Sequence, residues 1–259
     1  MDLIWDIIRE FFGFFIDVMV NALIFLYGIL GSNLGISIIA FTVIVRVAMY
    51  PLTRRQLRAS KAMSQLQPKI REIQKKYPKD RARVSQETMR LYREEGVNPI
   101  GCLGPMVVQL PIMIGMYQAI LRSLPRNPEG LVDLSQRLWS WVPGVHEAVP
   151  LNSGFLWLDL AEPDPSKVIL PLMVGASMWV QQRMMSTTST DPRQASMNRM
   201  MQWMMPVMFG AFTLGFPSGL ALYWVVSNLI GIALQYRTSG WGRLIPAPAP
   251  VVQPPLTEE

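Results

Sequence analysis

The sequence predicts an all-α polytopic membrane protein with five transmembrane helices, an N-terminal interfacial helix and a cytoplasmic helical hairpin. Its 259 residues are 50% hydrophobic and 16% charged, whereas a soluble domain carries roughly 25% charged residues. Apolar windows of about 20 residues, the length that crosses a bilayer, recur along the chain. A strongly basic segment separates the first two of these windows.

The five expected spans are residues 34–52, 103–124, 168–186, 200–214 and 218–236, of which the fourth is short and rich in Met. A further apolar stretch, Phe11–Leu30, contains Asp17 and Asn21 and is joined to the first span by three residues, 31–33. If both crossed the membrane, these three residues would make the whole reversal. We therefore interpret the stretch as an amphipathic helix at the outer interface, within an extracytoplasmic N-terminal segment, 1–33. The acidic start of the chain is unlike a secretory signal.

The distribution of charge predicts the orientation. Residues 53–97 hold 13 Lys and Arg against 5 Asp and Glu, whereas 125–167 hold 3 against 6 and 1–17 hold 1 against 4. The positive-inside rule therefore places 53–97 in the cytoplasm and the other two segments outside. After five crossings the N-terminus is outside and the C-terminus inside. Residues 187–199 then form a cytoplasmic loop, and 237–259 a Pro-rich cytoplasmic tail that we expect to be disordered.

The basic segment 53–97 has the pattern of a helical hairpin. Its first arm carries apolar residues at alternating spacings of three and four, typical of a helix–helix seam: Met63, Leu66, Ile70, Ile73 and Tyr77. Pro68 is expected to kink this arm, and residues 77–80 form a turn before the second arm, Arg81–Glu95. The candidate docking residues of this hairpin are Arg54, Arg55, Lys69, Lys75 and Lys76. Two interpretations stay open: a solvated surface touching anionic lipid headgroups, or a platform for an acidic partner such as ribosomal RNA or a targeting factor.

Arg46 is the only charged residue of the first span. A charge at membrane depth costs about 2.5–3.5 kcal/mol on insertion scales. The side chain can snorkel to the headgroups, or a polar cavity can shelter it. We favour the cavity, because intramembrane ionisable residues are functional candidates by default.

Every expected span carries amide or hydroxyl groups that suit such a cavity. They are Thr42, Gln109, Gln181, Gln182, Gln202, Asn228 and Gln235, with Trp224 on the same stripe as Asn228. A hydrophilic groove open to the cytoplasm would satisfy them together. The alternative is interhelical hydrogen bonding, worth about 0.6 kcal/mol per contact. The Met residues around 184–208 are equally consistent with an adaptable apolar surface and with lipid-compatible filler.

The composition argues against several other functions. One Cys, Cys102, and one His, His146, provide neither a disulfide nor a recognisable catalytic or metal-binding constellation. We therefore expect no enzyme activity, no cofactor, no metal and no direct DNA binding. The alternative function is a small transporter or channel with Arg46 as an anion site, although the internal inverted repeat typical of transporters is lacking.

Several motifs carry a family resemblance, in order, between residues 31 and 237. They are IVRVAMYPLT (44–53), LQPKI (66–70), VSQETMRLY (84–92), VNPIGCLGPMVVQLP (97–111), TTSTDP (187–192), MPVMF (205–209) and FPSGLALYWVVSN (216–228). Together they make the chain resemble the YidC/Oxa/Alb membrane protein insertases, in the short form without a large extracytoplasmic domain.

The resemblance implies five helices around a hydrophilic groove open to the cytoplasm and to lipid. It implies a protein of the inner (plasma) membrane that inserts nascent membrane proteins into the lipid bilayer, alone or with the Sec translocon. A ribosome and a targeting factor are further candidate partners, although the tail lacks the long basic helix of strong ribosome binders. The family's groove residues fall on Arg46, Thr42, Gln182 and Trp224, to which the residues themselves add Gln109 and Asn228.

Overall fold

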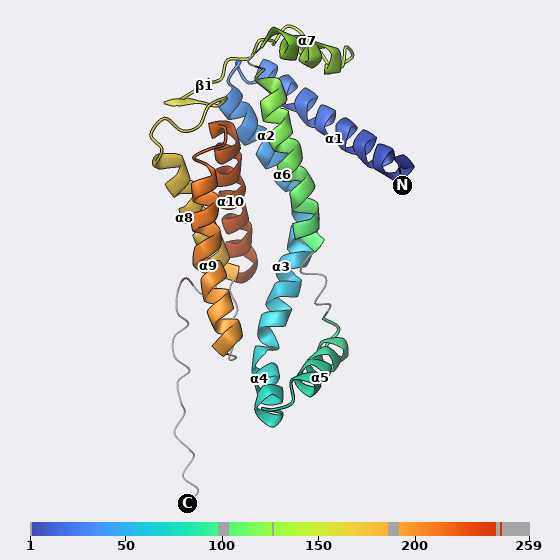
Figure 1. The fold of residues 1–259 in the computed structure, drawn as a ribbon, viewed down its shortest axis with the longest axis vertical. Coiled ribbons are helices and arrows are strands. Elements are labelled where there is room, and N and C mark those ends of the chain that lie inside the picture. The colour runs from blue at the N-terminus through green and yellow to red at the C-terminus, as the bar shows by residue number, and fades with distance from the viewer. Residues whose placement is uncertain (1, 98–103, 126, 186–191, 242–243, 245–259) are drawn as a thin grey trace, which may run out of the picture.

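The computed structural model describes residues 2–97, 104–125, 127–185, 192–241 and 244. These residues form ten helices and one two-stranded antiparallel sheet (Figure 1). The helices are α1 (Asp2–Ile29), α2 (Leu34–Ala48), α3 (Tyr50–Gln65), α4 (Gln67–Lys76), α5 (Arg81–Glu94), α6 (Gly104–Ser123), α7 (Pro128–Arg137), α8 (Ile169–Met185), α9 (Pro192–Phe212) and α10 (Ser218–Ser239). The strands are β1 (Gly154–Phe155) and β2 (Leu158–Asp159). Cys102, residues 187–191 and the tail from 245 lie outside the described residues.

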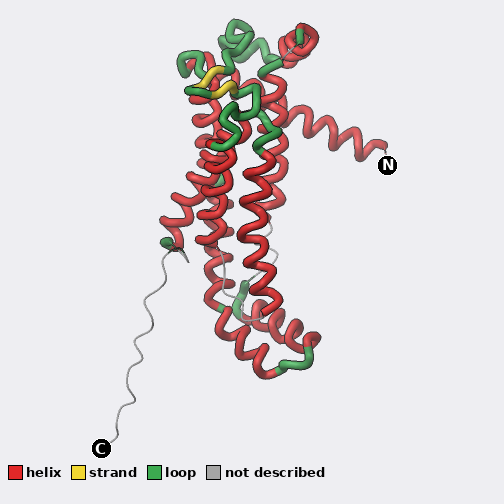
Figure 2. The backbone as a smooth tube through the Cα atoms, turned by 60° about the vertical axis from the view of Figure 1, so that its left-hand side comes forward, coloured by secondary structure: helices red, strands yellow, loops and turns green. Residues whose placement is uncertain are grey.

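The long helices α2, α6, α8, α9 and α10 run along one another as a bundle (Figures 1 and 2). One end of the molecule carries α7, the sheet and most of the loops, and is called the loop end below. The opposite end carries α4 and α5, which run back along each other, and is called the hairpin end. The mostly helical class expected from the sequence is therefore confirmed.

Helix α1 starts at Asp2, well before the expected stretch 11–30. Its N-terminal part projects away from the bundle in both views, where Phe11 and Phe14 are exposed (Figures 1 and 2). Its C-terminal part is buried through Val20, Leu23 and Ile24 and packs on α6 and α2. By length and composition, its segment Arg9–Ile29 is able to cross a membrane, and the interfacial position expected for it stays a prediction.

The polar residues of α1 have partners near the loop end. The Asn21 side chain donates to the carbonyl oxygen of Arg137 at 3.1 Å and accepts the N–H of Trp139 at 2.8 Å. Asp17 Oδ1 lies 3.5 Å from Arg122 Nη1 and 3.4 Å from Arg137 Nη1. Asp17 therefore ties α1 to α6 and to the end of α7, and Asn21 ties it to the end of α7.

Ser218–Thr238 of α10 is the second described segment long and apolar enough to cross a membrane. Helices α2 and α3 qualify as a third only if taken together, since they are bent by 60° at Met49. Pro51 lies in the first turn of α3, where proline lacks a donor that would be unpaired anyway. The same placement recurs at Pro68, so the kink expected there is a break at Leu66, between α3 and α4.

Helix α9 begins at Pro192, so residues 192–199, expected as loop, are helical. Within the expected loop 125–167, α7 and the small sheet are ordered elements. This segment also caps α10, because the backbone N–H groups of Ser218 and Gly219 donate to the carbonyl oxygens of Glu162 (2.7 Å) and Leu160 (3.1 Å). Such bonds satisfy the free donors of a helix N-terminus.

The hydrophobic core lies at the loop end. Its buried side chains come from the second half of α1 and α6, from the first half of α2, α8 and α10, and from the 125–167 segment. They include Leu23, Ile24, Leu34, Ile38, Met116, Ile120, Leu160, Leu170, Val174, Leu220 and Ala221. Among the side chains whose burial the structure describes, the other halves of these helices contribute few buried apolar residues. The bundle is therefore closely packed at one end and leaves room for a cavity towards the other.

Candidate functional site

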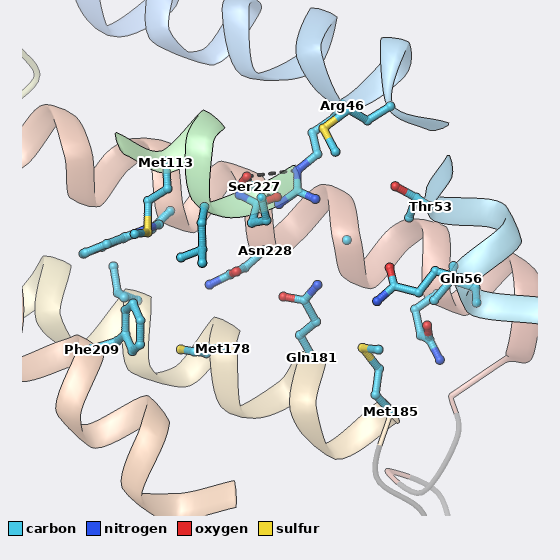
Figure 3. A pocket seen from close by; sticks show the side chains of 18 residues that line it. Arg46, Thr53, Gln56, Met113, Met178, Gln181, Met185, Phe209, Ser227 and Asn228 are labelled. Atoms are coloured by element: carbon cyan, nitrogen blue, oxygen red, sulfur yellow. Dashed lines mark hydrogen bonds between the residues drawn. The ribbon is translucent and has the colours of Figure 1, made fainter. Parts of the chain in front are cut away.

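A cavity of about 350 Å³ lies between α2, α3, α6, α8, α9 and α10, on the hairpin side of the core. Figure 3 shows Arg46 from α2, Gln56 from α3, Gln181 from α8 and Asn228 from α10 directed into the same space. The remaining lining residues mix thioether, aromatic and polar groups: Met49, Thr53, Leu57, Gln109, Leu110, Met113, Val174, Met178, Met185, Phe209, Trp224, Ser227, Gly231 and Gln235.

The guanidinium of Arg46 is held by a neutral group. Its Nε and Nη2 atoms donate to Ser227 Oγ of α10 at 2.9 and 2.6 Å (Figure 3). Among the described residues, no carboxylate lies within ion-pair distance of Arg46. A serine hydroxyl orients the guanidinium without neutralising it, so the cavity carries a net positive charge.

Two further side-chain pairs fix polar groups at the cavity wall. Gln109 Nε2 of α6 donates to the Tyr223 hydroxyl of α10 at 3.1 Å. Asn228 Nδ2 of α10 donates to Ser177 Oγ of α8 at 3.1 Å. These bonds join α10 to α6 and to α8, and interhelical bonds of this kind hold membrane bundles together.

Aromatic rings close the side of the cavity that faces the core. Trp224 is the first α10 residue of the lining, and its ring lies edge-on to Phe209 (5.4 Å between centroids) and Phe216 (6.2 Å). Phe216 in turn contacts Tyr117 of α6 edge-on at 5.5 Å. The cavity is therefore apolar and blocked at this side, and its polar groups lie towards the hairpin end.

Of the six groove residues expected from the sequence, the structure brings Arg46, Gln109, Trp224 and Asn228 together around the cavity. Thr42 does not line it: its side chain is buried, and its hydroxyl donates to the carbonyl oxygen of Ile38 at 2.6 Å.

The cavity-lining glutamine of α8 is Gln181, whereas the motif alignment places the family's residue on Gln182. Gly231 of α10 makes room for it, because a Cβ at that position would overlap the Gln181 amide. Sequence reasoning also missed Gln56 and Ser227. Ser227 stands beside Asn228 in the sequence, and a serine in an apolar helix is too common to indicate a cavity residue by itself.

The side chains of Arg54 and Arg55, near the start of α3, and of Lys75 and Lys76, at the end of α4, are exposed and lie outside the cavity lining. Lys69 instead pairs with Glu95, which joins α4 to the end of α5. The hydrogen bond that the Lys69 ammonium donates to this carboxylate raises the pKa of Lys69. Tyr77, in the turn between α4 and α5, lies under Lys76 (5.6 Å) and Arg83 (4.9 Å).

A second hollow, of about 610 Å³, lies between α8 and α9 and is almost wholly apolar. The two helices approach closely there, because Gly175 faces the Pro206 carbonyl oxygen and Gly210 faces that of Pro171. In the described part of the chain, no group of three or more His, Cys, Asp or Glu side chains is placed to hold a metal ion.

Comparison with known proteins decides the family. The model of the family described as "60Kd inner membrane protein" matches residues 25–241. The membrane protein insertase MisCA of Bacillus subtilis (strain 168) is 38% identical over 216 residues, which cover 81% of this chain and 72% of the relative. The chain belongs to this family. The resemblance to the YidC/Oxa/Alb insertases is thereby confirmed, and the chain is a membrane protein.

Relatives in the family differ in length. The membrane protein insertase YidC of Vibrio cholerae serotype O1 (strain M66-2) is 41% identical over 206 residues, which cover 79% of this chain but 33% of that protein. The crystal structure of an active YidC insertase with its first transmembrane domain resolved matches with a TM-score of 0.57 and 30% identity, covering 85% of this chain and 46% of that one. The chain thus spans most of MisCA but about a third of the YidC relatives' length.

Proposed function

We propose that this protein is a membrane protein insertase, which moves nascent membrane proteins into the lipid bilayer of the inner (plasma) membrane through a positively charged hydrophilic groove. The observation that carries the proposal is the un-neutralised Arg46 at the wall of a cavity lined by amides and Met side chains. The names of the relatives MisCA and YidC support it.

The proposed topology has five transmembrane spans, on α2, α6, α8, α9 and α10. It places the N-terminus and the 125–167 segment outside and the α4–α5 hairpin in the cytoplasm, with the C-terminus on the same side. The charge distribution supports this orientation, because 53–97 carries 13 basic and 5 acidic residues. With this orientation the polar side of the cavity opens towards the cytoplasm and its aromatic side faces outwards.

The proposed mechanism involves no covalent chemistry. The polar, often acidic, segment that a nascent chain must translocate enters the cavity from the cytoplasm. Arg46 attracts its carboxylates, and the amides of Gln181 and Asn228 replace part of its hydration. Polar groups in this position shorten the low-dielectric path that the segment still has to cross. The apolar segment then enters lipid, where burial of its surface contributes about 25 cal/mol per Å².

The hairpin is proposed as the part that meets larger partners. The exposed basic residues of the hairpin, Lys75 and Lys76, and those of the adjoining α3, Arg54 and Arg55, suit anionic headgroups and acidic partners alike. The candidate partners are the ribosome, a targeting factor and the Sec translocon. Lys69 is less available, because Glu95 already occupies it.

Reconstitution tests the proposal. Purified protein in lipid vesicles should insert a single-span substrate with an acidic translocated tail, measured as protection of that tail from added protease. Protein-free vesicles measure spontaneous insertion. Equal protection in both would overturn the proposal, and movement of a small anion into the same vesicles without any nascent chain would favour the channel alternative.

A further inference from the structure

Three glutamine side chains line the polar side of the cavity beyond Arg46, and none of them has a hydrogen-bond partner among the described residues. They are Gln56 of α3, Gln181 of α8 and Gln235 of α10. Gln181 lies against Gly231, one turn of α10 before Gln235. Gln235 lies about 12 Å along α10 from Ser227, the partner of Arg46, at 1.5 Å per residue. These amides therefore form a separate group, nearer the hairpin end than the charge.

Gln235 is the most informative of the three. Its side chain is 6% exposed, yet its Oε1 atom is buried without a hydrogen-bond partner. An unpaired acceptor in such a place is costly and calls for an explanation. Gln235 also lines the cavity, so a turn of its flexible side chain would bring this unpaired acceptor to a donor that enters from outside the protein.

The chemistry of the group indicates what that donor is. An amide side chain both donates and accepts, as does a peptide group. Three amides can thus pair with the backbone of an extended chain whatever its side chains are, whereas Arg46 selects for negative charge. An insertase must accept translocated segments of many sequences, and the peptide backbone is the feature they share.

We propose that Gln56, Gln181 and Gln235 bind the peptide backbone of the entering segment, with Gln235 Oε1 accepting a backbone N–H group. This inference rests on the proposed insertase function and deepens it. Recognition at the cavity then has two parts: sequence-independent binding of the backbone by the amides, followed by electrostatic attraction of acidic side chains by Arg46.

The test uses the full-length protein in vesicles and three substrates that share one apolar span. Their translocated tails are a Gly/Ser tail, the same tail with two Asp residues, and a tail in which Pro replaces most residues and so removes backbone N–H donors. The variants are Gln235→Met and the triple variant with Met at 56, 181 and 235. Gln118→Met on α6, outside the cavity lining, is the matched control.

Gln235→Met should lower insertion of the Gly/Ser and Asp tails alike, by about fivefold for one lost hydrogen bond, and the triple variant should lower it further. Wild-type protein should insert the Pro tail poorly, and the triple variant should insert it no worse, because the lost interaction is the same one. Gln235→Met should melt at or above the wild-type temperature, since no internal bond is lost. A lower melting temperature would mark the effect as structural and overturn the proposal.

Other outcomes separate this inference from the function on which it rests. If the triple variant inserted the Gly/Ser and Asp tails as well as the wild-type protein does, the backbone role would be overturned and the insertase proposal would stay intact. If the triple variant lost insertion of the Asp tail alone, the backbone role would be overturned too, because the amides would then act through Arg46. If wild-type protein inserted none of the three substrates, both proposals would fail.

Discussion

Arg46 is bound through two guanidinium nitrogens to one hydroxyl, that of Ser227, at 2.9 and 2.6 Å. The bond joins α2 to α10 and fixes the direction of the guanidinium, so that a remaining edge is directed into the cavity (Figure 3). Because the partner is neutral, the charge stays available for an acidic segment. An Asp or Glu in the place of Ser227 would hold Arg46 equally well but would cancel its field.

Replacement of Arg46 is expected to affect substrates according to their charge. Arg46→Ala should reduce insertion of a substrate with an acidic translocated tail by tenfold or more, because a hydrogen bond to a charged group is worth about 1.5–3 kcal/mol. A tail without charge should lose much less. Arg46→Lys should retain most of the activity, since the charge remains. Growth of a depletion strain and protease protection measure this, and full activity of the Ala variant on the acidic tail would refute the attraction step.

Gln181 and Gln182 provide a neighbouring pair on one helix. Gln181→Leu should reduce insertion severalfold, because Gln181 lines the cavity, whereas Gln182, which does not, should tolerate Leu with little loss. The measurement is the insertion of one substrate by both variants at equal protein amounts. The opposite order of effects would mean that the motif alignment, which favours Gln182, describes the working state better than the structure.

The close contact between Gly231 and the Gln181 amide leads to a further prediction. In Gly231→Ala the new methyl group would overlap the Gln181 amide. This amide is the free end of a flexible side chain, so it should move aside with little change in the melting temperature in detergent. Insertion should fall severalfold, because the displaced amide no longer faces the same part of the cavity, and adding Gln181→Ala should lower it no further. Gly28→Ala on α1 is the control, since a Cβ there meets nothing within 4 Å. Full insertion by Gly231→Ala would contradict the role of this contact.

Asp164 should stabilise the start of α8. Its carboxylate accepts the N–H of Ser166 (3.0 Å), the Ser166 hydroxyl (2.7 Å) and the N–H of Leu170 (2.9 Å). Burial raises its pKa, but these bonds outweigh burial, so that the net pKa lies below the ordinary value of 3.8. Loss of such a cap typically costs about 1 kcal/mol, and Asp164→Ala should lower the melting temperature by about 2–4 °C at neutral pH.

The pH dependence of that effect follows from the direction of the shift. A carboxyl group whose pKa is lower in the folded state stabilises the protein above its unfolded pKa and loses this contribution as pH falls through the folded pKa. Wild type and Asp164→Ala should therefore converge in melting temperature below about pH 3.8. Glu147→Ala, at an exposed position of the same segment, is the control. A difference that persists undiminished at low pH would show that the carboxylate is not its source.

The sequence predicted the helical class and four of the cavity residues because these depend on local patterns. Arg46 stands alone in an apolar run, and Trp224 and Asn228 share one face of α10 by their spacing. The choice between Gln181 and Gln182 depends on how α8 is rotated about its axis, and the observed rotation places the Gln181 amide against Gly231 of α10. Adjacent residues on a helix point about 100° apart, and their sequence order does not reveal which one faces the bundle.

The polar residues of α1 illustrate another limit. Asp17 and Asn21 were visible as polar positions in an apolar stretch, but their partners Arg122, Arg137 and Trp139 lie more than 100 residues away in the sequence. No spacing rule connects positions so far apart. The start of α9, by contrast, had a local signal in Pro192, since proline is favoured in the first turn of a helix.

Photocrosslinking of a stalled nascent membrane protein tests the central claim most directly. A photoreactive residue at 46, 181, 224 or 235 should crosslink to the translocated segment of the stalled chain, whereas one at the exposed position 157 in the β1–β2 turn should not. Crosslinks at the cavity positions that move along the substrate as it lengthens are the predicted result. No crosslink at any of the four positions, with stalled chains captured elsewhere on the protein, would contradict the cavity as the substrate path.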